Sequence, residues 1–397
     1  MAHRHKKAEV MEKETPKRRS PIRVLHVYRT YFPDPPGGLQ EAIRQIRQST
    51  RPYGISSTVF CLSPDPSPSR IDAPDGRIVR ARSWAAPASC DLGGAEAFRI
   101  FREQAADHDL IHYHFPWPFA DLLHMAIKPR IPAVMTYHAD IVRQMYLARL
   151  YSPLMWRTLR SMSAIIATSP DYIATSPILQ DPRISARVHM IPLGMADLRA
   201  MQPPPAPLPV PEGVPFFLFI GALRYYKGLQ NLVAAARHVN APVLIAGEGA
   251  QGEKLKQMAQ AAGAKNIMFL GPISDACKRN LLARCLAFVM PSNQRSEAFG
   301  LAMVEAAMFG KPLISCEIGT GTSYVNLKDK TGLVVPPDDP EALANVMNRL
   351  LHEPELVARL GSGARSHYET NLVDVAMGKA YAQLYQEILK HQRQHDG

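Results

Sequence analysis

A stretch with seven prolines between residues 201 and 215 divides this 397-residue chain into two parts. Proline has a fixed φ and no N–H, so this stretch cannot be a regular helix or a central strand. On both sides, short apolar runs alternate with longer segments of helical pattern, which is typical of parallel sheets covered by helices. The pattern therefore predicts two α/β domains. The apolar runs lie near residues 24–28, 110–114, 133–137 and 164–167, and then near 216–220, 242–246, 267–270, 286–290, 312–316 and 332–335.

The domain boundaries follow from this division and from the chain length, which is too great for one ordinary core. We expect a helix over about residues 374–392, because the apolar periodicity there is helical. The polar, basic N-terminal tail is expected to be disordered. The expected segments are the tail over 1–20, a first domain over 21–198, a linker over 199–215, a second domain over 216–373 and a terminal segment over 374–397.

Two glutamates, Glu297 and Glu305, stand eight residues apart with Gly300 between them. If a helix begins near Gly300, the free N–H groups and the helix dipole point at any anion there, so the backbone of Phe299, Gly300 and Leu301 is a candidate diphosphate site. Glu305 would lie about a turn and a half inside the helix, where its carboxylate could accept both hydroxyls of a ribose. This spacing favours a nucleotide-sugar site. The alternative is an ordinary amphipathic helix with solvated glutamates.

A second phosphate-binding candidate lies about seventy residues upstream. The apolar run at 216–220 leads into a loop that carries Arg224 and Lys227, followed by Gly228. In open α/β sheets ligands bind outside the carboxyl ends of the strands, so these two cations are expected to face a ligand there. Arginine offers a planar fork and lysine a point charge, and together they could neutralise a leaving diphosphate. The alternative is a solvated loop.

With these two motifs in place, the chain resembles glycosyltransferase family 4, the retaining enzymes of GT-B fold. Further matching segments are Gly37-Gly38, residues 136–140, residues 191–194 and residues 246–249. Within the family, the resemblance is to bacterial mannosyl- and rhamnosyltransferases of lipopolysaccharide O-polysaccharide assembly, through residues 223–228, 138–144 and 319–326. One departure is Ala222, which stands where many family members have an arginine directly after the glycine of the phosphate loop.

The resemblance implies an architecture and a mechanism. The expected fold class is α/β, GT-B, with two Rossmann-like domains, a deep interdomain cleft, and the terminal helix packing back on the first domain. Arg224 and Lys227 would act on the leaving diphosphate, His138 would face the reacting sugar, and Glu297 would hold sugar hydroxyls. The donor-binding set would be completed by Gly37, Gly38, Phe299, Gly300, Leu301 and Glu305. Transfer with retention needs no enzymic nucleophile, and no cofactor and no essential metal are expected. A cationic loop in one domain and His138 in the other also predict interdomain closure.

The subgroup resemblance also implies the substrates. The donor would be a nucleotide sugar, with GDP-mannose first and GDP-rhamnose or a UDP-sugar as alternatives. The acceptor would be a lipid-linked saccharide. Rival readings are a sugar-nucleotide epimerase or a sucrose-type synthase that acts on a soluble acceptor.

Charge is unevenly distributed. The net charge is +11, and residues 1–199 hold 27 Lys/Arg against 18 Asp/Glu. Residues 143–160 interleave arginines with large apolar side chains, a pattern suited to an anionic inner-membrane surface. A core-packed helix with surface arginines is the equal alternative.

Location and nucleic-acid binding can also be judged from the sequence. The chain has no 20-residue apolar span and no signal-peptide pattern, so we expect a cytoplasmic protein, free or peripheral on the inner membrane. The basic composition would permit a nucleic-acid binder, but no recognition motif appears, and no nucleic-acid partner is expected.

Overall fold

The computed structural model describes residues 21–34, 37–87, 90–141, 145–199 and 208–395. The expected disordered tail (1–20) and half of the expected linker (200–207) lie outside the described residues. Residues 208–216 contain no helix or strand.

The first half is built on a nine-stranded sheet of order β3-β4-β2-β1-β6-β7-β8-β9, with β5 added to β4. All neighbours are parallel except β3 and β5, which run antiparallel to β4. The strands are β1 (Ile22–Val27), β2 (Ile55–Ser63), β3 (Arg70–Ala73), β4 (Gly76–Ala85), β5 (Leu92–Gly93), β6 (Leu110–Phe115), β7 (Ala133–Tyr137), β8 (Ala164–Ala167) and β9 (Val188–Met190). The helices are α1 (Gly38–Thr50), α2 (Ala95–Ala106), α3 (Pro118–Ile127), α4 (Met145–Ser161) and α5 (Pro170–Thr175), with short 3-10 turns η1 (Arg51–Tyr53) and η3 (Ser185–Arg187).

The second half is a six-stranded, wholly parallel sheet of order β12-β11-β10-β13-β14-β15. This is the doubly wound 3-2-1-4-5-6 order, whose direction reverses between β10 and β13, and ligands bind outside the carboxyl ends of strands at such a switch point. The strands are β10 (Phe217–Ile220), β11 (Val243–Ala246), β12 (Ile267–Gly271), β13 (Ala287–Met290), β14 (Leu313–Cys316) and β15 (Gly332–Val335). The helical elements are η4 (Tyr225–Lys227), α6 (Leu229–Ala236), α7 (Gly252–Ala261), α8 (Asp275–Arg284), α9 (Leu301–Met308), α10 (Gly321–Val325) and α11 (Pro340–His352).

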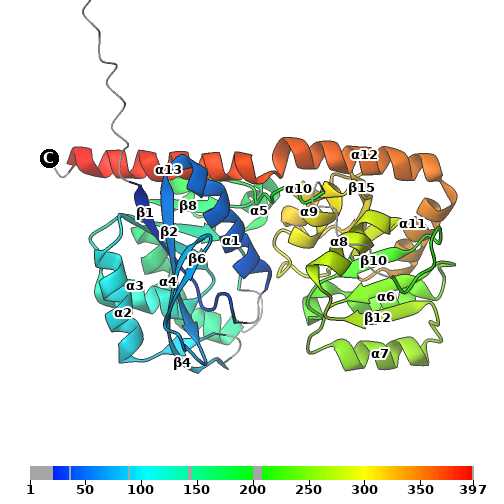
Figure 1. The fold of residues 1–397 in the computed structure, drawn as a ribbon, viewed down its shortest axis with the longest axis horizontal. Helices are drawn as coiled ribbons and strands as arrows, with labels where there is room; N and C mark the ends of the chain where they lie inside the picture. Colours follow the sequence, from blue (N-terminus) through cyan, green and yellow to red (C-terminus); the bar gives the residue numbers. More distant parts are fainter. Residues whose placement is uncertain (1–20, 35–36, 88–89, 142–144, 200–207, 396–397) are drawn as a thin grey trace, which may run out of the picture.

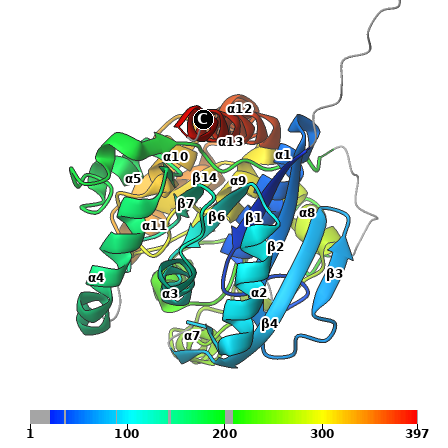
Figure 2. The same cartoon turned by 90° about the vertical axis from the view of Figure 1, so that its left-hand side faces the viewer.

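The last two helices join the halves. α12 (Pro354–Asn371) lies along the second half, and α13 (Asp374–His395) continues over the first half, next to α1 (Figures 1 and 2). The hydroxyl of Tyr385 lies 2.7 Å from a ring nitrogen of His112, and that of Tyr381 lies 3.0 Å from the hydroxyl of Thr136. Both tyrosines are fully buried. α13 is therefore bonded to β6 and β7 of the first domain.

Burial explains why the apolar runs form strands. Every residue of β6, β7, β8, β11, β13 and β14 is buried, as expected for parallel strands with helices on both faces. The predicted α/β class with two parallel-sheet domains is confirmed. Among the described residues, no helix is both long enough and apolar enough to span a bilayer.

Candidate functional site

The loop after β10 reaches the loop after β13 because a glycine lets the two backbones touch. Gly228 has a φ of 63°, and a Cβ at this position would lie 1.9 Å from the carbonyl oxygen of Pro291. Any other residue would be strained in φ and would clash with backbone. Lys227, the residue before this glycine, is thereby held against the loop that carries Glu297.

Lys227 and Glu297 form an ion pair at the switch point, with side chains 11% and 10% exposed. Ser292 Oγ donates to the same carboxylate at 3.3 Å, and Thr320 Oγ1 donates to the main-chain oxygen of Glu297 at 2.7 Å. Burial works against the charge on Lys227, but the Glu297 carboxylate and Tyr226 together more than compensate, so the pKa of Lys227 is raised. The structure thus brings these two predicted residues together as a charged pair.

Helix α9 begins where the sequence predicts. Gly300 precedes it with a φ of 84°, and its carbonyl accepts the N–H of Met303 at 2.8 Å. The N–H groups of Leu301 and Ala302 belong to the first turn, which has no intrahelical acceptor. The N-terminus of α9 and the positive end of its dipole therefore follow Glu297 by three residues, and Phe299 between them is buried in the core.

Glu305, inside α9, is held by a lysine that the sequence analysis missed. Lys278 on α8 donates to Glu305 Oε1 at 2.7 Å and also lies 3.4 Å from Asp275. Burial raises the pKa of the Glu305 carboxyl, and the Lys278 charge only partly offsets this rise. A lysine on a short polar helix carries little signal in the sequence, because its partner is 27 positions away on another helix.

Arg224 lies apart from the buried pair. Its side chain is exposed and lines a cavity of about 300 Å³ together with Gln230, Gln251 and Lys254. The positive charge of Arg224 opposes protonation of Lys227, so the two cations act on the same region. Burial raises the pKa of Tyr28 in the first domain, and the charges of Arg29 and, to a smaller extent, Arg224 partly offset this rise.

The two N-terminal glycines precede and open α1, on the side of the first domain that faces the second (Figure 1). Gly37 donates its N–H to the side chain of Gln40 at 3.0 Å, so this N–H is already engaged. Gly38 is exposed, with no atom within 4 Å of where a Cβ would stand. The carboxylate of Glu41, in the first turn of α1, adds to the raised pKa of Glu305.

His138 follows β7 and is bonded on two sides. Its N–H donates to the carbonyl of Phe115 at 3.2 Å, and its ring Nε2 lies 3.0 Å from Nδ1 of His114. The residue is 4% exposed, and burial lowers the pKa of the imidazole to about 3. The ring is accordingly neutral at ordinary pH.

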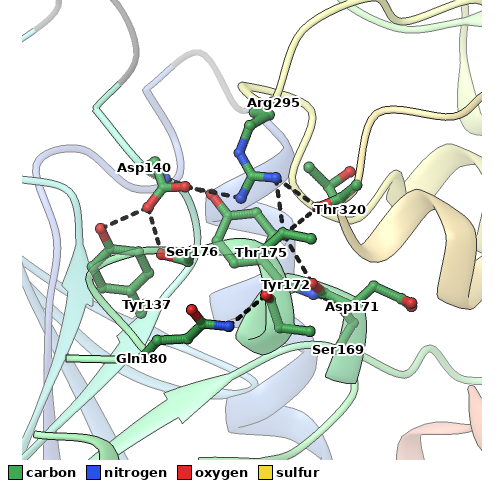
Figure 3. Close-up of polar contacts among 12 residues, drawn as sticks. Tyr137, Asp140, Ser169, Asp171, Tyr172, Thr175, Ser176, Gln180, Arg295 and Thr320 are labelled. Carbon is green, nitrogen blue, oxygen red and sulfur yellow. Dashed lines mark hydrogen bonds and ion pairs between the residues drawn. The ribbon is translucent and has the colours of Figure 1, made fainter. Parts of the chain in front are cut away.

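A polar network crosses from one half of the chain to the other (Figure 3). Arg295 Nη2 donates to Asp140 Oδ2 at 3.1 Å, and Arg295 Nη1 donates to the hydroxyl of Thr175 at 2.9 Å and to the carbonyl of Gly319 at 2.7 Å. Thr175 and Asp140 belong to the first half, whereas Arg295 and Gly319 belong to the second. The guanidinium also lies over the ring of Tyr172, 5.1 Å from its centroid.

Asp140 is fully engaged at the first-half end of this network. Its Oδ1 accepts hydrogen bonds from Tyr137 at 3.0 Å and from Ser176 at 2.8 Å. Asp140 stands two residues after His138, and Arg295 stands two residues before Glu297. The contact therefore ties the loops of two candidate catalytic residues together. The sequence analysis missed Arg295, because its partner is 155 positions away.

One group of side chains could hold a metal. Nitrogens of three buried histidines, His26, His112 and His114, lie within 4.8 Å of one another. In the described part of the chain both nitrogens of His112 already have partners, Tyr385 at 2.7 Å and Thr136 at 2.7 Å. These contacts fit neutral, hydrogen-bonded rings.

Comparisons with known proteins agree with the geometry. The model of Glycosyltransferase Family 4 matches residues 36–195, and that of Glycosyl transferases group 1 matches residues 204–367. The O-antigen chain mannosyltransferase C of Escherichia coli is 40% identical over 371 residues, covering 93% of this chain and 99% of that protein. The chain is a family 4 glycosyltransferase. The D-rhamnosyltransferase WbpZ of Pseudomonas aeruginosa is 42% identical to this glycosyltransferase over 352 residues, covering 87% and 91% of the two chains.

Solved structures support the fold of this glycosyltransferase. The sucrose-phosphate synthase of Thermosynechococcus elongatus superposes with a TM-score of 0.77 at 22% identity, covering 93% of this chain and all of that one. The expected GT-B class is confirmed. The resemblance to family 4, stated from the motifs, is confirmed as well.

Proposed function

We propose that this glycosyltransferase moves a hexose, mannose from GDP-mannose, onto a lipid-linked saccharide in O-polysaccharide assembly, with retention at the sugar. The similarity to an O-antigen chain mannosyltransferase over almost the whole of both chains carries the proposal. GDP-rhamnose is the second candidate donor, since a rhamnosyltransferase is equally similar. Sugar transfer, rather than epimerisation, is favoured by the same two relatives, which are both named as sugar transferases.

The charged pair at the switch point suggests how the donor is bound. Lys227 and the N-terminus of α9 would take the donor diphosphate, and Glu297, released from Lys227, would accept the sugar hydroxyls. Arg224 would add a second cation from the rim. Glu305 would accept the ribose hydroxyls on the other side of α9. In this arrangement Lys227 would act on the diphosphate side, and Glu297 on the sugar side, of the bond that breaks.

The transition state of such a transfer is oxocarbenium-like, with negative charge growing on the leaving diphosphate. Catalysis would depend on positioning and on fixed charges in place before reaction. The acceptor hydroxyl would attack from the face that the diphosphate leaves, and the departing phosphate oxygen would take its proton. His138 would serve as a neutral group beside the sugar, since burial keeps its imidazole unprotonated.

Donor identity can be tested by thermal shift with GDP, UDP and ADP and their sugar conjugates. A ligand that binds only the folded protein stabilises it by about 2.7 kcal/mol at a concentration of 100 Kd. We expect a shift with GDP and GDP-mannose that is lost in Glu305→Ala and Lys227→Ala. Lys256→Ala is the matched control, because Lys256 pairs with Glu253 at the exposed surface. A shift selective for UDP would reject the GDP donor, and no shift with any nucleotide would reject the donor site.

A lipid-linked acceptor would lie at a membrane surface, and α4 has an exposed face suited to contact that surface. Arg149, Leu150, Arg157 and Arg160 are exposed on α4, with Leu150 81% exposed. Leu122, on the neighbouring α3, is also exposed. The opposite face of α4 packs into the core. The helix therefore has the core-packed face of one expectation and the exposed arginines and leucine of the other. Arg143 and the side chains of residues 145–148 lie outside the described residues.

An exposed leucine among arginines fits the interface of an anionic bilayer, where apolar burial and charge attraction add. We propose that this face docks the enzyme on the cytoplasmic side of the inner membrane. We expect Leu150→Asp to reduce co-sedimentation with phosphatidylglycerol-containing vesicles by about tenfold or more. Val375→Asp is the control, since Val375 is 62% exposed and lies on α13. Equal binding of both variants and the wild type, or binding that salt does not weaken, would contradict the proposal.

A further inference from the structure

Three buried histidines of the first domain form a row of hydrogen-bonded rings, the histidine file. His26 Nδ1 lies 3.1 Å from His114 Nε2, and His114 Nδ1 lies 3.0 Å from His138 Nε2. They come from β1, from β6 and from the end of β7, three neighbouring strands of the sheet. The ring planes of His114 and His138 are inclined by only 23°. None of the three residues is more than 4% exposed.

Burial keeps all three rings neutral, because it lowers the pKa of each imidazole below its usual range. A neutral imidazole carries one N–H and one bare nitrogen. The two contacts of the file therefore need two donors, and the single N–H of His114 can serve only one of them. The ring nitrogen of His114 that carries the hydrogen therefore fixes the tautomers of His26 and His138.

The two possible arrangements of the hydrogens differ at His26, the member of the file farther from His138. If His114 donates toward His138, then His26 donates from Nδ1, and its Nε2 is bare. If His114 instead donates from Nε2 toward His26, then Nδ1 of His26 is bare and its Nε2 carries the hydrogen. That atom is buried with no hydrogen-bond partner in the described part of the chain. Orphaned buried N–H groups are rarer than under-satisfied acceptors, so the first arrangement is favoured.

We propose that His26 and His114 are positioning residues that fix His138 in the tautomer protonated on Nδ1, so that its ring offers a hydrogen-bond donor to the reacting sugar. Nδ1 of His138 has no hydrogen-bond partner among the described residues either, but unlike His26 Nε2 it is not among the fully buried unpartnered atoms, so a hydrogen there can be solvated until a sugar oxygen replaces the water. A neutral donor can bond a sugar oxygen without placing a positive charge beside an oxocarbenium-like centre. The role at the sugar rests on the proposed function, whereas the tautomer is a property of the protein alone.

The tautomer can be read directly by two-bond ¹H–¹⁵N correlation of the ¹⁵N-histidine-labelled protein, with His138 assigned by His138→Gln. We expect His138 to show a protonated Nδ1 and a bare Nε2. A bare Nδ1, or a doubly protonated ring, would overturn the proposal. So would a change of the His26 and His114 signals with added Zn²⁺, because a metal would take the lone pairs that the file uses.

Variants of His26 test whether the file sets the tautomer. His26→Asn keeps a donor N–H at the position of Nδ1, and His26→Leu removes it. We expect His26→Leu to give mixed His138 tautomers and to lower kcat about tenfold with donor affinity unchanged, and His26→Asn to restore both. His124→Leu is the control, because His124 is also buried and bonded at both nitrogens, to Tyr113 at 2.9 Å and Ser161 at 2.9 Å.

The outcomes separate this proposal from the proposed function. An unchanged His138 tautomer in His26→Leu would overturn the positioning role, even if the enzyme transfers mannose as proposed. Failure of every nucleotide sugar to bind would reject the proposed function, and the spectrum would still decide the tautomer. The proposal would also fail if His124→Leu lowered kcat as much as His26→Leu and if His26→Asn did not restore kcat. The loss of kcat would then be a structural effect.

Discussion

Lys227→Met is expected to lower kcat/KM by about 10²- to 10³-fold, because it removes a fixed cation from the place where the leaving diphosphate gains charge. The same change leaves the carboxylate of Glu297 buried without its partner, since both side chains are about one-tenth exposed. Removing one member of a buried pair typically costs about 3–5 kcal/mol of folding free energy. Steady-state kinetics and urea unfolding of the same preparations measure both effects.

The double variant Lys227→Met/Glu297→Gln separates the two effects. It contains no unpaired charge, so we expect it to regain most of the stability lost in the single variant while remaining inactive. Lys256→Met, which opens a surface pair between side chains 53% and 81% exposed, should change neither quantity appreciably. Recovery of activity together with stability in the double variant would show that Lys227 is structural and would remove it from the catalytic set.

The phosphate loop and α9 could be predicted because their signals are local. An apolar run followed by cations, and a glycine between two glutamates, need only the rule that ligands bind at the carboxyl ends of parallel strands. The pairing of Lys227 with Glu297 was not predicted. It depends on the contact between Gly228 and Pro291, which only the folded chain supplies.

The interactions that the sequence analysis missed all join distant segments. His112 and His114 alternate visibly along one strand, but their partners depend on the register that sets His26 beside His112 and His114 beside Thr136. Strands β2, β3, β4, β5 and β9 were also missed. β3, β5 and β9 are short and largely exposed. β2 and β4 are long and partly or mostly buried, but serines and a threonine interrupt the apolar run in β2 and arginines interrupt it in β4. Residues 319–326, which the sequence analysis used only for the resemblance to the subgroup, contain the short helix α10, whose N-cap is the buried Thr320.

The contact of Arg295 with Asp140 gives the expected interdomain closure a specific residue to test. Arg295→Met removes the crossing bonds of the guanidinium to Asp140 and Thr175, whereas the bond from Thr175 Oγ1 to the carbonyl of Gly319 at 2.6 Å remains. Asp140 keeps its bonds to Tyr137 and Ser176. We expect kcat/KM to fall by about 10²-fold, since small misplacements of reacting groups have effects of this size. The radius of gyration from small-angle scattering should rise, and the unfolding free energy should change little, because each domain retains its own sheet and core.

The kcat/KM and the radius of gyration of Arg295→Lys should lie between those of the wild type and of Arg295→Met. One ammonium cannot reproduce the guanidinium fork that bonds Asp140, Thr175 and Gly319 together. Arg23→Met is the matched control: Arg23 pairs with Asp109 at 3.0 Å, but both residues belong to the first domain. If Arg295→Met left both the radius of gyration and kcat/KM at their wild-type values, the spacing of His138 and Glu297 could not depend on this contact. Closure would then have to be held by the hydrogen bond of Thr175 to Gly319, by α12 and α13, or by the donor itself.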